Sequence, residues 1–339
     1  MRTSVTTKTK IILSILFCLL LTGIAVAAGS ISISGTEMAA ILRHHLFHAS
    51  LPSSISAMTD TIFWKIRLPR VLVAFLVGGM LSVSGAVLQA VLENPLASSY
   101  TLGVSSGACL GAALVMVLPI SAAWALPAGA FVFGLATVLV VLGLTRLLDR
   151  SAHNETIILV GIVFSLFVNA VMTLINVLYA DNIRQLYMWM MGSFSSRGWQ
   201  HIKIMLPVCI VGCIILSRCT KELDLLTFGD EQAMAMGVQT SKVKRILILT
   251  VTMLTAISVC FTGTIGFIDL VAPHVVRRIF GPQHRVVLPM AFVYGGGLLA
   301  FADMLSRCLA APLEIPVGAI MALVGAPFFA LLYFRKRSL

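Results

Sequence analysis

The sequence is poor in charged residues, and especially in acidic ones. Of its 339 residues only 13 are aspartate or glutamate, and all charged residues together make up 11%. Apolar residues make up 59%, and the mean hydropathy is +1.01. A soluble core could not bury so much apolar surface. The composition therefore excludes an ordinary soluble globular protein and predicts a chain that crosses a membrane many times.

Motifs for common chemistry are also missing. The chain has no G-x-x-x-x-G-K-[ST] loop for ATP phosphates, no H-E-x-x-H and no nucleophile motif. The seven cysteines are an odd number and lie mostly in apolar stretches, which favours reduced, packed thiols over a disulfide framework or a zinc site. We therefore expect no catalytic residue, cofactor or metal in this chain, and an enzyme is disfavoured.

The basic residues follow membrane topology. A net charge of +11 could indicate nucleic-acid binding, but lysine and arginine cluster at the ends of apolar blocks. With the N-terminus placed in the cytoplasm, the inner loops carry twice as many of the 24 basic residues as the outer loops. This bias predicts cytoplasmic N- and C-termini, with lipid and not nucleic acid around the chain.

The apolar blocks predict an all-α polytopic membrane protein with about ten transmembrane helices, forming a single transmembrane domain over residues 1–339. The expected spans lie at residues 11–28, 67–92, 98–118, 122–147, 156–180, 201–217, 246–265, 263–278, 286–309 and 315–334. The first is expected to be retained, although Ala25–Ala27 mimics a signal-peptidase site. Between the first two spans, residues 29–66 form an expected extracytoplasmic segment.

Three histidines in that outer segment, His44, His45 and His48, have no nearby carboxylate or thiolate in the sequence pattern that a metal site requires. Solvated histidines are the commoner interpretation, and a ligand role stays open.

A polar stretch at 220–245 separates two long apolar blocks. The residues in its middle predict a short cytoplasmic helix over 229–237. Gly229 and Gly237 bound this helix, while Asp230 and Glu231 suit the positive end of its dipole. Ala233 and Met234 give it a small, adaptable apolar surface. One interpretation is a helix that docks into a groove of a partner protein, and the other is a solvated loop with an amphipathic turn.

Small and polar residues within the spans also have two interpretations, because such residues either let helices pack closely or line a passage for a large solute. The candidates for a translocation pathway are Gly78, Ser82, Gly85, Gln89, Asn94, Ser105, Ser106 and Asn169.

Charged residues near the span ends leave further alternatives. Four acidic residues would suit an ion-coupled secondary transporter: Glu93, Asp269, Asp303 and Glu314. The alternative is that they are helix-end charges and members of internal ion pairs, such as Asp303 with Arg307. On the outer side, Arg67, Arg70 and Arg307 suit either docking of a partner's carboxylates or interfacial anchoring.

Several ordered motifs carry a family resemblance. They are R-L-P-R at 67–70, G-x-x-L-x-x-S-G-x-x-L-Q ending at Gln89, N-P-L-A at 94–97, L-G-V-S-S-G-A at 102–108, G-x-I-G-F-I-x-L-x-A-P-H-x-x-R at 263–277 and E-I-P-V-G at 314–318. Together they resemble the permease subunits of bacterial ABC importers for iron-siderophore complexes, haem and cobalamin, over nearly the whole chain after residue 60.

The resemblance implies the fold of a type II ABC importer permease in the cytoplasmic membrane. It implies a pathway between two copies of this chain, or between this chain and a close relative. It further implies two ATPase subunits, which bind ATP and Mg²⁺ and dock at 229–237, and a substrate-binding lipoprotein or periplasmic protein that docks at Arg67, Arg70 and Arg307.

Two departures from the family pattern stand out. Ser98 and Ser99 follow N-P-L-A where the family often has Asp-Pro, and Asp269 stands where it usually has glycine. Pairing of Asp269 with Arg277 or Arg278 is one interpretation.

Overall fold

The computed structural model describes residues 7–29, 33–118, 120, 122–149, 153–179 and 183–337. Outside the described residues lie the expected cytoplasmic N-terminus at 1–6, the chain end at 338–339 and residues 30–32 of the outer segment. Arg2 and Arg150, two of the basic residues counted for the predicted orientation, also lie outside the described residues.

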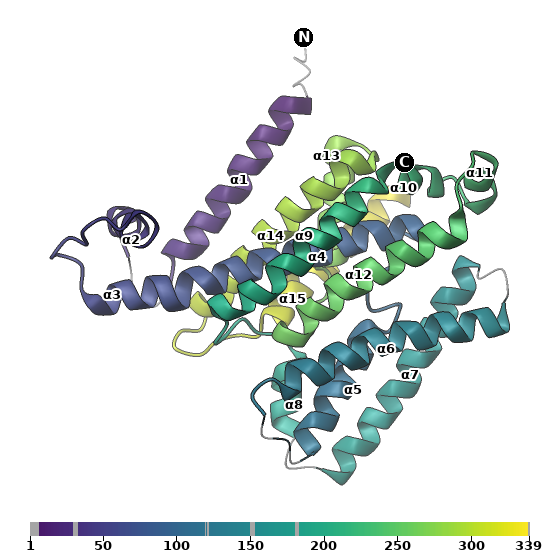
Figure 1. Ribbon diagram of the computed structural model, residues 1–339, viewed down its shortest axis with the longest axis horizontal. Helices are drawn as coiled ribbons and strands as arrows, with labels where there is room; N and C mark the ends of the chain where they lie inside the picture. Colours follow the sequence, from purple (N-terminus) through teal and green to yellow (C-terminus); the bar gives the residue numbers. More distant parts are fainter. Residues whose placement is uncertain are drawn as a thin grey trace.

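All regular secondary structure in the described chain is helical, with no strands, and Figure 1 shows how the helices are arranged. The helices are α1 (Thr7–Ala27), α2 (Gly35–Phe47), α3 (Ala57–Thr61), α4 (Leu68–Val91), α5 (Val104–Val117), α6 (Ala125–Leu148), α7 (Asn154–Leu178), α8 (Ile183–Met190), α9 (Trp199–Arg218), α10 (Thr220–Leu226), α11 (Asp230–Ala235), α12 (Thr240–Thr262), α13 (Ile268–Phe280), α14 (His284–Cys308) and α15 (Val317–Arg337). A π-helical segment, Ile62–Arg67, joins α3 to α4 without a break.

Seven of these helices are long and apolar enough to cross a membrane: α1, α3–α4, α6, α7, α9, α12 and α14. Helix α5 and the apolar part of α15 are shorter, and α13 has 13 residues. Together they account for the ten expected crossings and confirm the predicted fold class. The short helices α2, α3, α8 and α10 were not foreseen, because none of them forms a long apolar block.

Helix α4 is the centre of the bundle, and 83% of the residues in its most apolar 18-residue stretch are buried. Its small residues allow this burial. A Cβ atom added at Gly78 would overlap the backbone of Gly295 in α14, and one at Gly85 would overlap the backbone of Asp269 in α13. Ser82 Oγ donates to the Ile268 carbonyl at 3.3 Å. These small residues let α4 pack closely against α13 and α14 at Gly78, Ser82 and Gly85.

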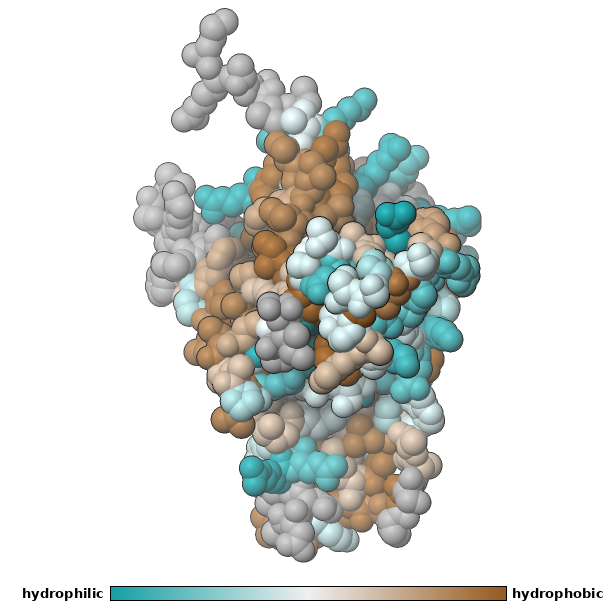
Figure 2. All heavy atoms as spheres, turned by 90° about the vertical axis from the view of Figure 1, so that its left-hand side faces the viewer, coloured by the Kyte–Doolittle hydropathy of each residue, from teal (hydrophilic) through white to brown (hydrophobic). Residues whose placement is uncertain are grey.

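The two ends of the bundle differ. Helices α10 and α11 lie at one end, and α2 and α3 lie at the opposite end (Figure 1). The α2–α3 region has its own small core of Ile33, Ile41, Ile55 and Phe63. Seen from that side in Figure 2, the side chains of α1 form a continuous hydrophobic column. Leu16, at 57% exposed, is typical of this lipid-facing surface.

Candidate functional site

Helix α11 forms where the sequence predicts a short helix. Gly229 (φ 100°) and Gly237 (φ 90°) bound it, and both adopt backbone conformations that glycine tolerates without strain. Ala233 is fully buried, whereas Glu231 is exposed and Met234 is 53% exposed. Helix α11 therefore packs one side against the bundle and leaves an acidic and a soft apolar side chain at the surface.

A chain of four polar side chains holds α11 to the bundle. Lys244 Nζ donates to Asp230 Oδ2 at 2.5 Å and to Asn154 Oδ1 at 2.7 Å. Asn154 Nδ2 in turn donates to Glu93 Oε1 at 2.8 Å. Lys244 is only 7% exposed, so its charge depends on these partners. These hydrogen-bonded side chains connect α11 to the start of α12, the start of α7 and the end of α4.

Sequence reasoning did not single out Lys244 or Asn154. Each looks like an ordinary polar residue at the end of a span. Only the fold brings Lys244 beside Asn154, 90 residues earlier in the chain.

At the opposite end of the bundle, the arginines Arg67, Arg70 and Arg307 lie inside a polar network. Arg70 donates to both carboxylate oxygens of Asp303, at 2.9 to 3.2 Å, and to both of Glu314, at 2.7 and 3.1 Å. Arg307 pairs with Asp303 at 3.1 Å, which confirms the predicted i,i+4 pair. The network joins the start of α4, the end of α14 and the loop before α15.

The three guanidinium groups are largely buried, so they are not freely available at the surface of this chain, and their expected docking role stays a prediction. Arg67 and Arg70 are 5% and 6% exposed, and the Arg307 side chain is 10% exposed. Arg67 donates to the Ala27 carbonyl at 3.0 Å, and Arg307 donates to the carbonyls of Ala28 and Ala25 at 3.1 and 2.9 Å. The carbonyl oxygens at the end of α1 have no partners in their own helix, so they attract the arginines inward.

The predicted pathway residues do not gather at one place. Gln89 donates to the Asp269 carbonyl at 3.1 Å and accepts from Arg277, so it belongs to the contact between α4 and α13. Asn94 accepts from the Leu96 amide at 2.9 Å and stabilises a turn. The remaining candidates are Ser105, which is buried in α5, Ser106, which is half-buried, and Asn169, which is exposed on α7. A transport role for this set stays a prediction.

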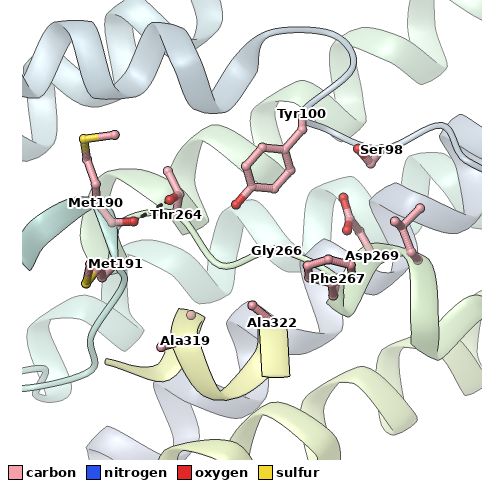
Figure 3. Close-up of a pocket in the computed structure, with 12 residues that line it drawn as sticks. Ser98, Tyr100, Met190, Met191, Thr264, Gly266, Phe267, Asp269, Ala319 and Ala322 are labelled. Atoms are coloured by element: carbon pink, nitrogen blue, oxygen red, sulfur yellow. Dashed lines mark hydrogen bonds between the residues drawn. The ribbon is translucent and has the colours of Figure 1, made fainter. Parts of the chain in front are cut away.

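A cavity of about 480 Å³ opens where α8, α13 and α15 meet (Figure 3). Tyr100, Thr264 and Phe267 line it together with Asp269. None of the predicted pathway residues lines it. The sequence offered two signals for it, since the departures from the family pattern at Ser98 and Asp269 both fall in its lining. The other lining residues are ordinary membrane residues brought together by the fold.

Two of the three outer histidines, His44 and His45, have protein partners. His45 Nε2 lies 2.9 Å from Asp60 Oδ1, and the His45 ring stacks on Trp64 with centroids 4.2 Å apart. His44 Nδ1 lies 2.6 Å from the Ala49 carbonyl oxygen. Among the residues that the structure describes, no group of three histidine, cysteine, aspartate or glutamate side chains could hold a metal ion.

The arrangement defines a multi-pass membrane transport subunit, with the small helix α11 at the surface of one end and a charged network at the other. The chain belongs to the FecCD transport family, whose model matches residues 13–335. It is a permease subunit of an ABC importer, as the motifs predict, and in this family the ATPase is a separate subunit. The secondary-transporter alternative is not supported.

Relatives agree with this identification. The chain is 37% identical to the hemin transport system permease protein HmuU of Yersinia pestis, with 82% of this chain and 84% of that protein covered. It is 36% identical to the cobalamin import system permease protein BtuC of Halobacterium salinarum, with 84% and 76% covered.

A solved structure is similar over almost the whole chain. An inward-facing metal-chelate type ABC transporter matches with a TM-score of 0.81 and 26% identity, covering 96% of this chain and 99% of that one.

Proposed function

We propose that this chain carries a bulky metal chelate, of the ferric-siderophore, haem or cobalamin class, across the cytoplasmic membrane of a bacterium. The observation that carries the proposal is the family match over residues 13–335, supported by relatives named for hemin and cobalamin import. Measurements of uptake, and not the fold, identify which member of this class is the substrate.

The proposed working unit contains two permease chains, most simply two copies of this one, with the pathway between them. Two ATP-binding subunits bind ATP and Mg²⁺ on the cytoplasmic side, and a substrate-binding lipoprotein or periplasmic protein docks on the outer side. The exposed apolar face of α15, where Leu323 is 76% exposed, supports contact with a second copy or with lipid.

Helix α11, with Gly229 and Gly237 at its ends, is the proposed contact with the ATPase. Movement of α11 would act on α12, α7 and α4 through the Asp230–Lys244–Asn154–Glu93 chain. Short polar contacts of this kind can make the four elements move together. In this proposal Asp230 and Lys244 are positioning residues, and Glu231 and Met234 face the ATPase.

The outer end around Arg67, Arg70 and Arg307 is the proposed docking side for the binding protein. Because the three guanidinium groups have internal partners, we propose that they mainly hold the shape of this surface. Exposed basic neighbours such as Lys65 would then meet carboxylates of the binding protein.

Uptake of labelled cargo tests the function directly. Cells with and without this chain are supplied with labelled ferric siderophore, haem and cobalamin. We expect loss of ATP-dependent uptake of one of them, which names the cargo. Unchanged uptake of all three, together with failure of an ATPase subunit to co-purify with this chain, would contradict the proposal.

A further inference from the structure

The cavity at α8, α13 and α15 is nearly free of charge. Its volume of about 480 Å³ is in the range of small-molecule sites. Figure 3 shows Tyr100, Thr264 and Asp269 around it, with Ala319 and Ala322 of α15 on the opposite side. The residues that line it include hydroxyl groups and apolar side chains but no lysine, arginine or histidine. Asp269 is the single acidic residue among them.

Asp269 is buried with only part of its hydrogen-bonding capacity used. The residue is 1% exposed. Its Oδ2 accepts from the Ser99 amide at 3.2 Å and from the Ser99 hydroxyl at 3.1 Å. Its Oδ1 is buried and has no hydrogen-bond partner in the described chain. A buried carboxylate with an unused oxygen is costly, and inside a membrane protein it indicates a functional site.

Among the residues that the structure describes, no basic side chain forms an ion pair with Asp269. Of the two expected partners, Arg277 instead donates to Gln89 Oε1 and to the Ala86 carbonyl, and Arg278 is exposed. The positive end of α13 stabilises an acid in its first turn, as at Asp269, but it supplies only a partial charge. The negative charge therefore acts on the cavity beside it, where low dielectric and the lack of counter-charges preserve its effect.

We propose that this cavity receives a positively charged, hydrogen-bond-donating part of the cargo, such as an ammonium group, and that Asp269 selects for it. The assignment of this group to the cargo rests on the proposed transport function. The selectivity of the cavity for cations does not, because it follows from the placement of Asp269 alone.

Thiol labelling measures the charge preference without knowledge of the cargo. The complete transporter carrying Ala322→Cys, held in lipid nanodiscs, is treated with a methanethiosulfonate that bears either a trimethylammonium or a sulfonate group. Mass spectrometry of the peptide that contains residue 322 gives each rate, so the native cysteines do not interfere. Rates are normalised to those of a free thiol.

We expect the cationic reagent to be preferred at residue 322, and Asp269→Asn to lower that preference about tenfold. Asp269→Glu, which keeps the charge, should retain it. Cys308, an exposed native thiol outside the cavity lining, is the control, and its charge preference should show no change with Asp269→Asn. An unchanged preference at residue 322, or no modification there, overturns the proposal.

Uptake separates the cargo claim from the cavity claim. The probes are a ferric trihydroxamate with a free ammonium group and its neutral N-acetylated form. Asp269→Asn should reduce uptake of the ammonium form about tenfold relative to the neutral form, and an equal effect on both contradicts charge selection. If the wild-type chain takes up neither form, the proposed function fails for hydroxamates, and the labelling result still decides the cavity.

Discussion

At the scale of single residues, the charged groups act mainly on each other. Arg70 lies between Asp303 and Glu314, and Asp303 also pairs with Arg307. The Asp303 side chain is fully buried. A buried ion pair adds little net stability when complete, but loss of one member leaves the other charge desolvated and unpaired. Arg70 therefore contributes to the stability of the fold, whatever part the outer surface plays in docking.

Replacement of Arg70 tests this statement. Arg70→Met should destabilise the permease by about 3–5 kcal/mol, since Asp303 and Glu314 both lose a partner. The measurement is thermal denaturation of the detergent-purified complex, followed by size-exclusion chromatography. Arg43→Met, at an exposed arginine of α2, is the control and should change little. Equal losses in the two variants would contradict the buried network, and a loss of uptake in Arg70→Met would not by itself demonstrate docking.

At the scale of elements, the small helix α11 depends on its connection to larger ones. Its six residues are too few to form a stable helix alone. Burial of Ala233 and the contact between Asp230 and Lys244 hold it in place. An element of this kind can follow a partner's movement as a unit and pass that movement to α12.

A charge exchange tests this transmission. Lys244→Met should reduce uptake about tenfold while ATP hydrolysis by the partner subunit continues, because α11 loses its link to α12 and α7. The exchanged pair Asp230→Lys with Lys244→Asp should recover part of the uptake. Uptake per ATP hydrolysed, in proteoliposomes, is the measurement.

Lys242 provides the matched control for this test, because it lies in the same first turn of α12 but is exposed. Lys242→Met should leave the ratio of uptake to hydrolysis unchanged. If Lys244→Met lowers uptake and hydrolysis in the same proportion, Lys244 has only a structural role.

At the scale of the whole molecule, α10 and α11 lie at one end of the helical bundle and α2 and α3 at the other (Figure 1). The bias of basic residues predicts that the α11 side is cytoplasmic. That orientation is required if α11 is to meet an ATPase that uses cytoplasmic ATP.

Labelling of whole cells tests the orientation. In a Cys308→Ser background, which removes the exposed native thiol, Lys65→Cys should react with a membrane-impermeant maleimide in intact cells. Lys242→Cys should react only after the cells are permeabilised. The reverse pattern would require an inverted chain and would contradict the proposed contact between α11 and the ATPase.

Much of the fold could be predicted from the sequence alone. Hydropathy is a local property, so the ten spans and the short helix between Gly229 and Gly237 follow from neighbouring residues. The family motifs are also local, and they were sufficient to predict a permease subunit of an ABC importer. The pairing of Asp303 with Arg307 belongs here too, because four residues span about one helical turn.

Only the tertiary structure decided which side chains are buried and which residues meet. Arg70 and Asp303 are 233 positions apart in the chain, and the sequence alone could equally place Arg70 on an exposed rim. Likewise, the sequence alone does not say whether the small residues of α4 line a passage or pack against other helices, because that depends on which helices lie beside α4. The partners of Lys244 and the cavity beside Asp269 have the same origin. Burial and long-range contact depend on how helices assemble, and no short stretch of sequence contains that information.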